Sequence, residues 1–218
     1  MIPVLPLSDA STWSAAKGIL KKGGILALPT EFSYALSEAP EWGNPALFPW
    51  ERNSRIYRLK ERDSSKPVLY LAGSLGIVER FACLPSSTIG CRLAFRWPAF
   101  QTLVLRAKPL AIRLGMASRD GVSFRIPHQT LLRRFLLFLG TPVSGTSLNI
   151  SGKEPITEVR EASLVFPTLD AVIDGGFKPG KPVSAVVDVR YGTPIVIREG
   201  GSIWSPRASF RENCAKIV

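Results

Sequence analysis

A run of small polar side chains in the second half of the chain could bind an anion. The stretch "SGTSLNISG" (residues 144–152) carries hydroxyl groups, a carboxamide and two glycines. Hydroxyls and backbone N–H groups beside glycine can hold a phosphate or a carboxylate. The same residue types also favour an ordinary turn. Their composition alone leaves both interpretations open.

Basic side chains elsewhere could meet the same anion. Lys60 and Arg62 precede a serine-rich loop, and Arg125 and Arg198 each lie in a segment predicted to be a strand. Arg125 alternates with Phe124 and Ile126, so it points to the opposite face of its strand. An arginine inside a strand usually faces solvent. Several together could instead converge on phosphates.

Other kinds of chemistry find little support in the sequence. It contains neither G-x-x-x-x-G-K-[ST] nor G-x-G-x-x-G, so no common phosphate-loop motif is present. The single histidine, His128, follows a proline and is expected at a helix cap or on the surface. Three cysteines without C-x-x-C spacing argue against a zinc site and a disulfide framework. An enzyme built this way would work by positioning substrates and neutralising charge.

The composition indicates a folded protein with anionic partners. The chain has 218 residues, of which 28 are Lys or Arg and 17 are Asp or Glu, giving a net charge of +11. This excess of positive charge favours a nucleotide or a nucleic acid as partner. The alternative is a basic protein that has no nucleic-acid partner. No signal peptide and no membrane span are expected. We therefore expect a cytoplasmic protein that makes no contact with a membrane.

Predicted strands and helices alternate along the chain with short connections. The strands are expected at 25–30, 67–73, 102–107, 121–127, 169–176, 184–190 and 194–200. The helices are expected at 11–20, 54–62, 75–82, 87–97, 129–140 and 157–166. This order predicts one α/β domain with a twisted, open, mixed parallel and antiparallel sheet and helices on both faces. Strands 184–190 and 194–200 are expected to form an antiparallel hairpin. The domain is predicted over residues 1–205 and a tail over 206–218, and residues 38–54 could form a lid.

Seven motifs occur along the chain in the same order as in the YrdC/YciO-like family, and the chain resembles that family. Its best-known members are threonylcarbamoyl-AMP synthases. The motifs are "GGILALPTEFSYAL", "RIYRLKERDSSKP", "RWPAFQTLVL", "SFRIP", "GTSLNISG", "SAVVD" and "VIREG". The resemblance covers about residues 10–203. It implies a single α/β domain around a basic concave cavity.

The resemblance also implies a reaction. Synthases of the family join L-threonine, bicarbonate and ATP, with Mg²⁺, into threonylcarbamoyl-adenylate and pyrophosphate. Partner transferase proteins then use the product to modify adenosine 37 of tRNA. Some members bind double-stranded RNA.

The resemblance assigns roles to ten residues of this chain. The expected threonine and carbamate ligands are Thr30, Tyr34, Arg125 and Ser184. The expected nucleotide ligands are Lys60, Arg62, Thr102, Ser147, Asn149 and Arg198, of which Lys60 and Arg62 are also the expected catalytic residues. No protein residue is expected to ligate a metal. The hydroxyl-rich stretch would then form a wall for the adenylate.

The chain departs from the family pattern at several of these motifs. Ala99 and Phe100 stand where the family has Gly-Pro, Leu148 stands for alanine and Ala185 for threonine. The larger side chains at 99, 100 and 148 are expected to narrow the pocket. Two alternatives to the synthase follow: a non-catalytic protein that binds double-stranded RNA or tRNA, and a related enzyme with another amino acid or carbamoyl donor.

Overall fold

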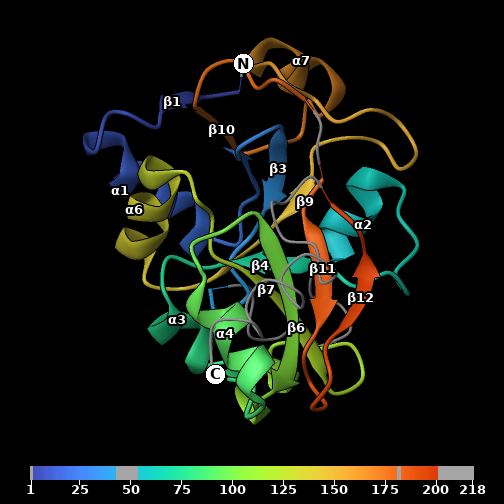
Figure 1. The fold of residues 1–218 in the computed structure, drawn as a ribbon. Helices are drawn as coiled ribbons and strands as arrows, with labels where there is room; N and C mark the ends of the chain where they lie inside the picture. The colour runs from blue at the N-terminus through green and yellow to red at the C-terminus, as the bar shows by residue number, and fades with distance from the viewer. Residues whose placement is uncertain (1, 43–53, 181–182, 201–218) are drawn as a thin grey trace.

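Two β-sheets form the centre of the molecule, and short helices lie around them (Figure 1). The computed structural model describes residues 2–42, 54–180 and 183–200. The five-stranded sheet has the order β1-β10-β2-β3-β9, formed by β1 (Val4–Pro6), β2 (Leu26–Pro29), β3 (Tyr34–Ser37), β9 (Thr146–Ser147) and β10 (Ala171–Asp174). The seven-stranded sheet has the order β12-β11-β6-β7-β4-β8, with β5 paired to β6. Its strands are β4 (Leu69–Leu71), β5 (Ala82–Cys83), β6 (Gln101–Ala107), β7 (Gly121–Arg125), β8 (Val143–Ser144), β11 (Ala185–Asp188) and β12 (Ile195–Arg198).

Helices pack on the sheets through apolar faces. They are α1 (Ser11–Lys21), α2 (Ser54–Lys60), α3 (Leu75–Glu79), α4 (Thr88–Phe95), α5 (Pro109–Arg113), α6 (Thr130–Leu139) and α7 (Val159–Val165). Helices α1 and α6 lie side by side (Figure 1), where the rings of Trp13 and Phe135 meet edge to face at 5.7 Å. Gly140 ends α6 in the left-handed conformation that glycine adopts without a steric penalty.

The α/β architecture with mixed sheets is confirmed, and so is the antiparallel β11–β12 hairpin. The prediction of one open sheet is corrected, because the strands divide into two sheets. Strands β1, β3, β5, β8 and β9 and helix α5 lie outside the ranges predicted for strands and helices. Residues 43–53 of the candidate lid and the predicted tail lie outside the described residues.

Residues 143–147 join the two sheets. Strand β8 pairs with β4 of one sheet and β9 pairs with β3 of the other. Gly145 lies between them and donates its N–H to Leu69 O at 2.8 Å. A Cβ atom at this position would lie 2.7 Å from Leu71 Cγ, so a side chain cannot fit without movement. Part of the hydroxyl-rich stretch is therefore a link between the sheets and not a simple loop.

The two sheets differ in what covers their faces. In the five-stranded sheet, Leu26 and Leu28 point into one apolar cluster while Ile25 and Ala27 point into another, so both faces are buried. The seven-stranded sheet buries one face against α3, α4 and α5 through side chains such as Leu103. Its opposite face turns toward an open cavity. This uncovered face positions the candidate site.

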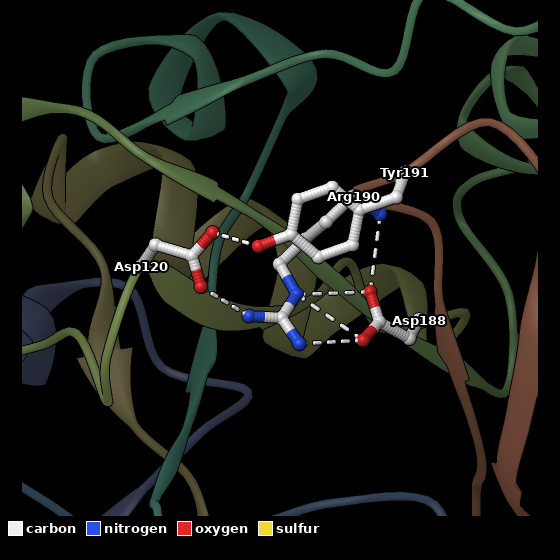
Figure 2. A network of polar contacts seen from close by, with 4 residues as sticks. All are labelled: Asp120, Asp188, Arg190 and Tyr191. Atoms are coloured by element: carbon white, nitrogen blue, oxygen red, sulfur yellow. Dashed lines mark hydrogen bonds and ion pairs between the residues drawn. The ribbon is translucent and has the colours of Figure 1, made fainter.

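A network of charges fixes the turn of the β11–β12 hairpin. Figure 2 shows Arg190 between the carboxylates of Asp188 and Asp120, with Tyr191 donating its hydroxyl to Asp120. Arg190 Nη2 lies 2.7 Å from Asp188 Oδ2, and Arg190 Nη1 lies 2.5 Å from Asp120 Oδ1. Because Asp120 directly precedes β7, this network ties the hairpin turn to the neighbouring strands.

Candidate functional site

A cavity of about 470 Å³ opens over the uncovered face of the seven-stranded sheet. Polar side chains from both sheets and from the segment after α2 line it, beside a group of apolar ones. Seven of the ten predicted site residues lie in its wall, namely Thr30, Arg62, Thr102, Arg125, Ser147, Ser184 and Arg198. Tyr34, Lys60 and Asn149 are not among the lining residues. The fold therefore brings together groups that are up to 168 positions apart, from Thr30 to Arg198.

In one part of the cavity wall the hydroxyl groups of Thr102 and Ser184 lie beside Arg198, and we call this part the hydroxyl corner. Strands β6 and β11 run parallel, and they place Thr102 Oγ1 within 3.1 Å of Ser184 Oγ. Arg198 donates to the backbone oxygen of Ser184 from Nε at 3.1 Å and from Nη2 at 2.8 Å. These bonds orient the guanidinium beside two hydroxyls. The corner offers several donors to an anion.

Three arginines line this cavity, Arg62, Arg125 and Arg198, and the charges of two of them affect the pKa of the third. Partial burial lowers the pKa of Arg198, and the charges of Arg125 and Arg62 lower it further. Arg62 donates to Pro67 O at 3.3 Å, while its buried Nε has no hydrogen-bond partner among the described residues. Within those residues neither Arg62 nor Arg198 forms an ion pair. Like charges held close together are stabilised by an anion placed between them.

Arg125 differs from the other two because it has a carboxylate partner. Its Nη2 forms an ion pair with Glu31 Oε2, and the other oxygen of Glu31 accepts the backbone N–H of His128 at 2.9 Å. The ring of Phe100 covers the guanidinium of Arg125, with 4.4 Å between the ring centroid and Cζ. The buried Nε of Arg125 has no hydrogen-bond partner in the described part of the chain. As the strand alternation predicted, Phe124 and Ile126 point into the core on the other side.

Lys60 lies behind the cavity wall. Its side chain is 1% exposed, and Nζ donates to the backbone oxygen of Ser147 and to Asn149 O and Oδ1 at 2.9 and 2.7 Å. Its own backbone oxygen accepts the N–H of Ser151 at 2.8 Å. Burial lowers the pKa of Lys60 to about 7, with a smaller contribution from the charge of Arg62. Lys60 therefore holds the 147–151 segment in place, where we expected direct contact with phosphates.

Tyr34 also acts behind the wall. It is fully buried, and its hydroxyl donates to Gly176 O at 2.8 Å and accepts the N–H of Gly175 at 3.3 Å. Burial raises the pKa of this hydroxyl to about 12, so it remains protonated. A Cβ at Gly175 would lie 2.5 Å from Pro29 Cβ, which explains the glycine there. Tyr34, at the start of β3, thus holds the 174–176 turn against Pro29, the last residue of β2.

The departures from the family pattern are distributed unevenly around the cavity. Phe100 lines it, as expected. Leu148 is fully buried in the core with Tyr34, and Ala99 packs against the core beneath the seven-stranded sheet. Ala99 and Leu148 therefore do not line the cavity, and our expectation that they narrow it was wrong.

Two residues at the cavity were not predicted from the sequence. Phe32 lines the cavity and pairs with the expected Phe100, and Glu31, next to the predicted Thr30, is the ion-pair partner of Arg125. The acid of the "PTE" motif was a usable signal for Glu31. The contacts of Glu31 and Phe100 with Arg125 have no local signal, because strand β7 is distant in sequence from both.

The described residues give no evidence for a built-in metal site or a membrane segment. Within 2–42, 54–180 and 183–200, no group of three or more His, Cys, Asp or Glu side chains could hold a metal ion. No helix in the same part of the chain is long and apolar enough to cross a membrane.

Comparisons with known proteins agree with this architecture. The Sua5/YciO/YrdC family profile, described as "Telomere recombination", matches residues 18–200. A threonylcarbamoyl-AMP synthase of Neisseria gonorrhoeae is 30% identical over 174 residues, which are 79% of this chain and 88% of that protein.

Two solved structures superpose on most of the chain. Pyrococcus abyssi Sua5 complexed with L-threonine gives a TM-score of 0.74 at 25% identity, over 92% of this chain and 58% of the Sua5 chain. The chain thus spans less than two thirds of that protein. YciO of E. coli gives a TM-score of 0.76 at 22% identity, over 93% of this chain and 95% of that chain, and shows the shared fold alone.

Proposed function

The chain belongs to the Sua5/YciO/YrdC family, and on that premise we propose that it is an L-threonylcarbamoyl-AMP synthase. The proposed enzyme is an ATP-using transferase that converts L-threonine, bicarbonate and ATP into threonylcarbamoyl-adenylate, pyrophosphate and water. The observation that carries the proposal is the cavity with Arg62 and Arg198 in its wall, neither of which has an ion pair among the described residues. A triphosphate would place negative charge beside these two arginines.

The hydroxyl corner is the proposed phosphate site. Arg198, Ser184 and Thr102 present their donors together, and Arg62 faces the same space. During adenylation, negative charge builds up on the departing pyrophosphate, and fixed guanidinium groups stabilise it. Arg62 and Arg198 thereby lower the barrier without taking or giving a proton. The absence of a histidine dyad is consistent with this mechanism.

The part of the cavity around Arg125 is the proposed amino-acid site. Arg125 retains a buried Nε without a partner, and Thr30 contributes a hydroxyl close by. We assign the carboxylate of threonine to Arg125. The threonine bound in the related Sua5 structure supports threonine as the amino acid. Carbamate formation from threonine and bicarbonate releases water, and one carbamate oxygen then attacks the α-phosphorus.

The nucleotide is assigned to the segment that Lys60 holds. Ser147 lines the cavity and donates its hydroxyl to Asn149 Oδ1 at 2.7 Å. Asn149 Nδ2 donates in turn to Lys153 O at 2.6 Å. This chain of bonds pre-forms the wall, which reduces the loss of conformational freedom when ATP binds. Lys60 is thus proposed as a positioning residue.

Mg²⁺ enters this scheme with ATP, as part of the substrate. The cavity wall offers oxygen donors of the type that Mg²⁺ accepts, such as the hydroxyls of Ser147 and Thr102. The described residues contain no acidic cluster that would hold the ion alone. Phosphate oxygens would therefore supply most of its ligands, and the ion would offset charge on the phosphates. The product is proposed to serve tRNA modification through a partner transferase.

Pyrophosphate release tests the proposal. MgATP is incubated with the protein, with L-threonine and bicarbonate added separately and together. The expected result is release only when both are present, and its loss in Arg62→Ala. Release with bicarbonate and a different amino acid would support the related-enzyme alternative. No release and no ATP binding, with RNA affinity that falls steeply with salt, would favour the RNA-binding alternative.

A further inference from the structure

Two aromatic rings form one wall of the cavity beside Arg125. The rings of Phe32 and Phe100 meet edge to face, with centroids 4.7 Å apart and an interplanar angle of 61°. Both residues line the cavity and are only partly buried. The Phe100 ring also stacks on the Arg125 guanidinium at 4.4 Å. An aromatic surface thus adjoins the proposed carboxylate anchor.

Both rings are carried by rigid turns. Trp97 donates its indole N–H to Gln101 O at 3.1 Å, and Ala99 N–H donates to Ile126 O at 3.1 Å, so the turn that carries Phe100 is tied to β7. The turn that carries Phe32 is closed by the bond from Thr30 N–H to Ser33 O at 2.9 Å. The turns fix the backbone positions of both residues, and the contacts of the Phe100 ring with Phe32 and Arg125 restrain the ring itself. The two rings therefore restrict the size of what binds against them.

We propose that Phe100 determines which amino acid this protein accepts. This inference rests on the proposed function and goes further by assigning a size limit to the site. The side chain of a short amino acid such as threonine packs its methyl group on the Phe100–Phe32 wall while its carboxylate meets Arg125. An extra methylene group changes binding by a moderate factor when the wall is rigid. Long or aromatic side chains collide with the rings. Phe100 also keeps Arg125 in one orientation through their cation–π contact.

Two substitutions separate these effects. Phe100→Ala removes the wall, and Phe100→Leu keeps most of the bulk but removes the ring that stacks on Arg125. The matched control is Phe95→Ala, because Phe95 is 70% exposed on α4 and does not line the cavity. Thermal unfolding checks that each variant is folded. Binding of L-threonine, L-serine, L-valine and L-leucine is measured by calorimetry in the presence of a non-hydrolysable ATP analogue.

The inference makes a distinct prediction for each variant. Phe100→Ala is expected to raise the affinity for leucine relative to threonine by about tenfold or more. Phe100→Leu is expected to weaken all the amino acids alike, by about 2- to 30-fold. Phe95→Ala is expected to change neither. An unchanged leucine-to-threonine ratio in Phe100→Ala would overturn the inference.

The binding readout keeps this inference apart from the proposed function. If the wild type binds threonine but releases no pyrophosphate, the synthase proposal fails while the selectivity measurement still decides the role of Phe100. If the wild type releases pyrophosphate and Phe100→Ala has the same amino-acid preference, the synthase proposal stands and the role of Phe100 is refuted. A wild type that binds none of the four amino acids refutes both.

Discussion

The two ends of the β11–β12 hairpin each carry an arginine, and the two arginines have opposite surroundings. At the turn, Arg190 is enclosed by the carboxylates of Asp188 and Asp120 (Figure 2). At the other end, Arg198 donates to Ser184, and the positive charges of Arg125 and Arg62 lower its pKa. The charge of Arg190 at the turn is neutralised by carboxylates of the protein itself. The other end has an excess of positive charge.

This difference separates a structural charge from a binding charge. Arg190 satisfies its hydrogen bonds within the protein, and it connects the hairpin to the start of β7. Arg62 and Arg198 have no carboxylate partner among the described residues and lie on a cavity wall. We therefore expect substitutions at the turn to alter stability, and substitutions at the cavity to alter ligand affinity.

The largest effects are expected from the arginines of the cavity. Arg62→Ala and Arg198→Ala each remove a charge-assisted contact worth about 1.5–3 kcal/mol. Steady-state kinetics should show kcat/KM for ATP reduced about 10- to 150-fold in each variant. Thermal unfolding should show little change, because neither arginine holds an ion pair in the described structure. A variant with full activity would place the phosphates elsewhere.

A substitution at the hairpin turn should lower stability and leave activity unchanged. Arg190→Ala leaves the largely buried carboxylate of Asp188 without its main partner, and we expect a loss of about 1–3 kcal/mol in the free energy of unfolding. Urea denaturation measures this loss. Pyrophosphate release by the folded variant should equal that of the wild type. Unchanged stability with impaired catalysis would reverse the contrast between the two ends.

Lys60 should make the free energy of unfolding depend on pH in the alkaline range. Burial and the charge of Arg62 lower its pKa to about 7, whereas an unfolded chain has an ordinary lysine value of about 10.4. Between about pH 7 and 10 the unfolded state binds more protons, so the free energy of unfolding should rise with pH. Lys60→Met should lose this rise, and Lys66→Met on the exposed loop should keep it. Denaturation at several pH values compares the three proteins, and equal slopes would contradict the assignment.

The smallest expected effect is a loss of stability at acid pH that depends on Asp188. Burial by itself would raise the pKa of Asp188, but hydrogen bonds from Arg190 prevail and lower it. Asp188 therefore contributes stability above its unfolded pKa of about 3.9, and this contribution is lost as the pH falls through the lower folded value. Below about pH 4 the wild type should lose stability more steeply than Arg190→Ala. Parallel acid titrations of the two proteins would argue that this pair contributes nothing.

Sequence reasoning succeeded where the signal was local. The period of a strand placed Arg125 opposite Phe124, and the motif around Ser147 located one cavity wall. Burial of Lys60 could not be predicted, because it depends on carbonyl groups 87 and 89 positions away. The stacking of Phe100 on Arg125 likewise depends on how two turns meet in space. Strand β9 escaped detection because it contains two residues and is defined by its partner strand.

Product identification tests the central claim most directly. The protein is incubated with MgATP, L-threonine and ¹³C-bicarbonate, and the nucleotides are separated and weighed by mass spectrometry. We expect an adenylate that contains threonine and one ¹³C atom, formed by the wild type and by Arg190→Ala but strongly reduced in Arg62→Ala. ATP consumption without such a labelled adenylate would contradict the proposed synthase.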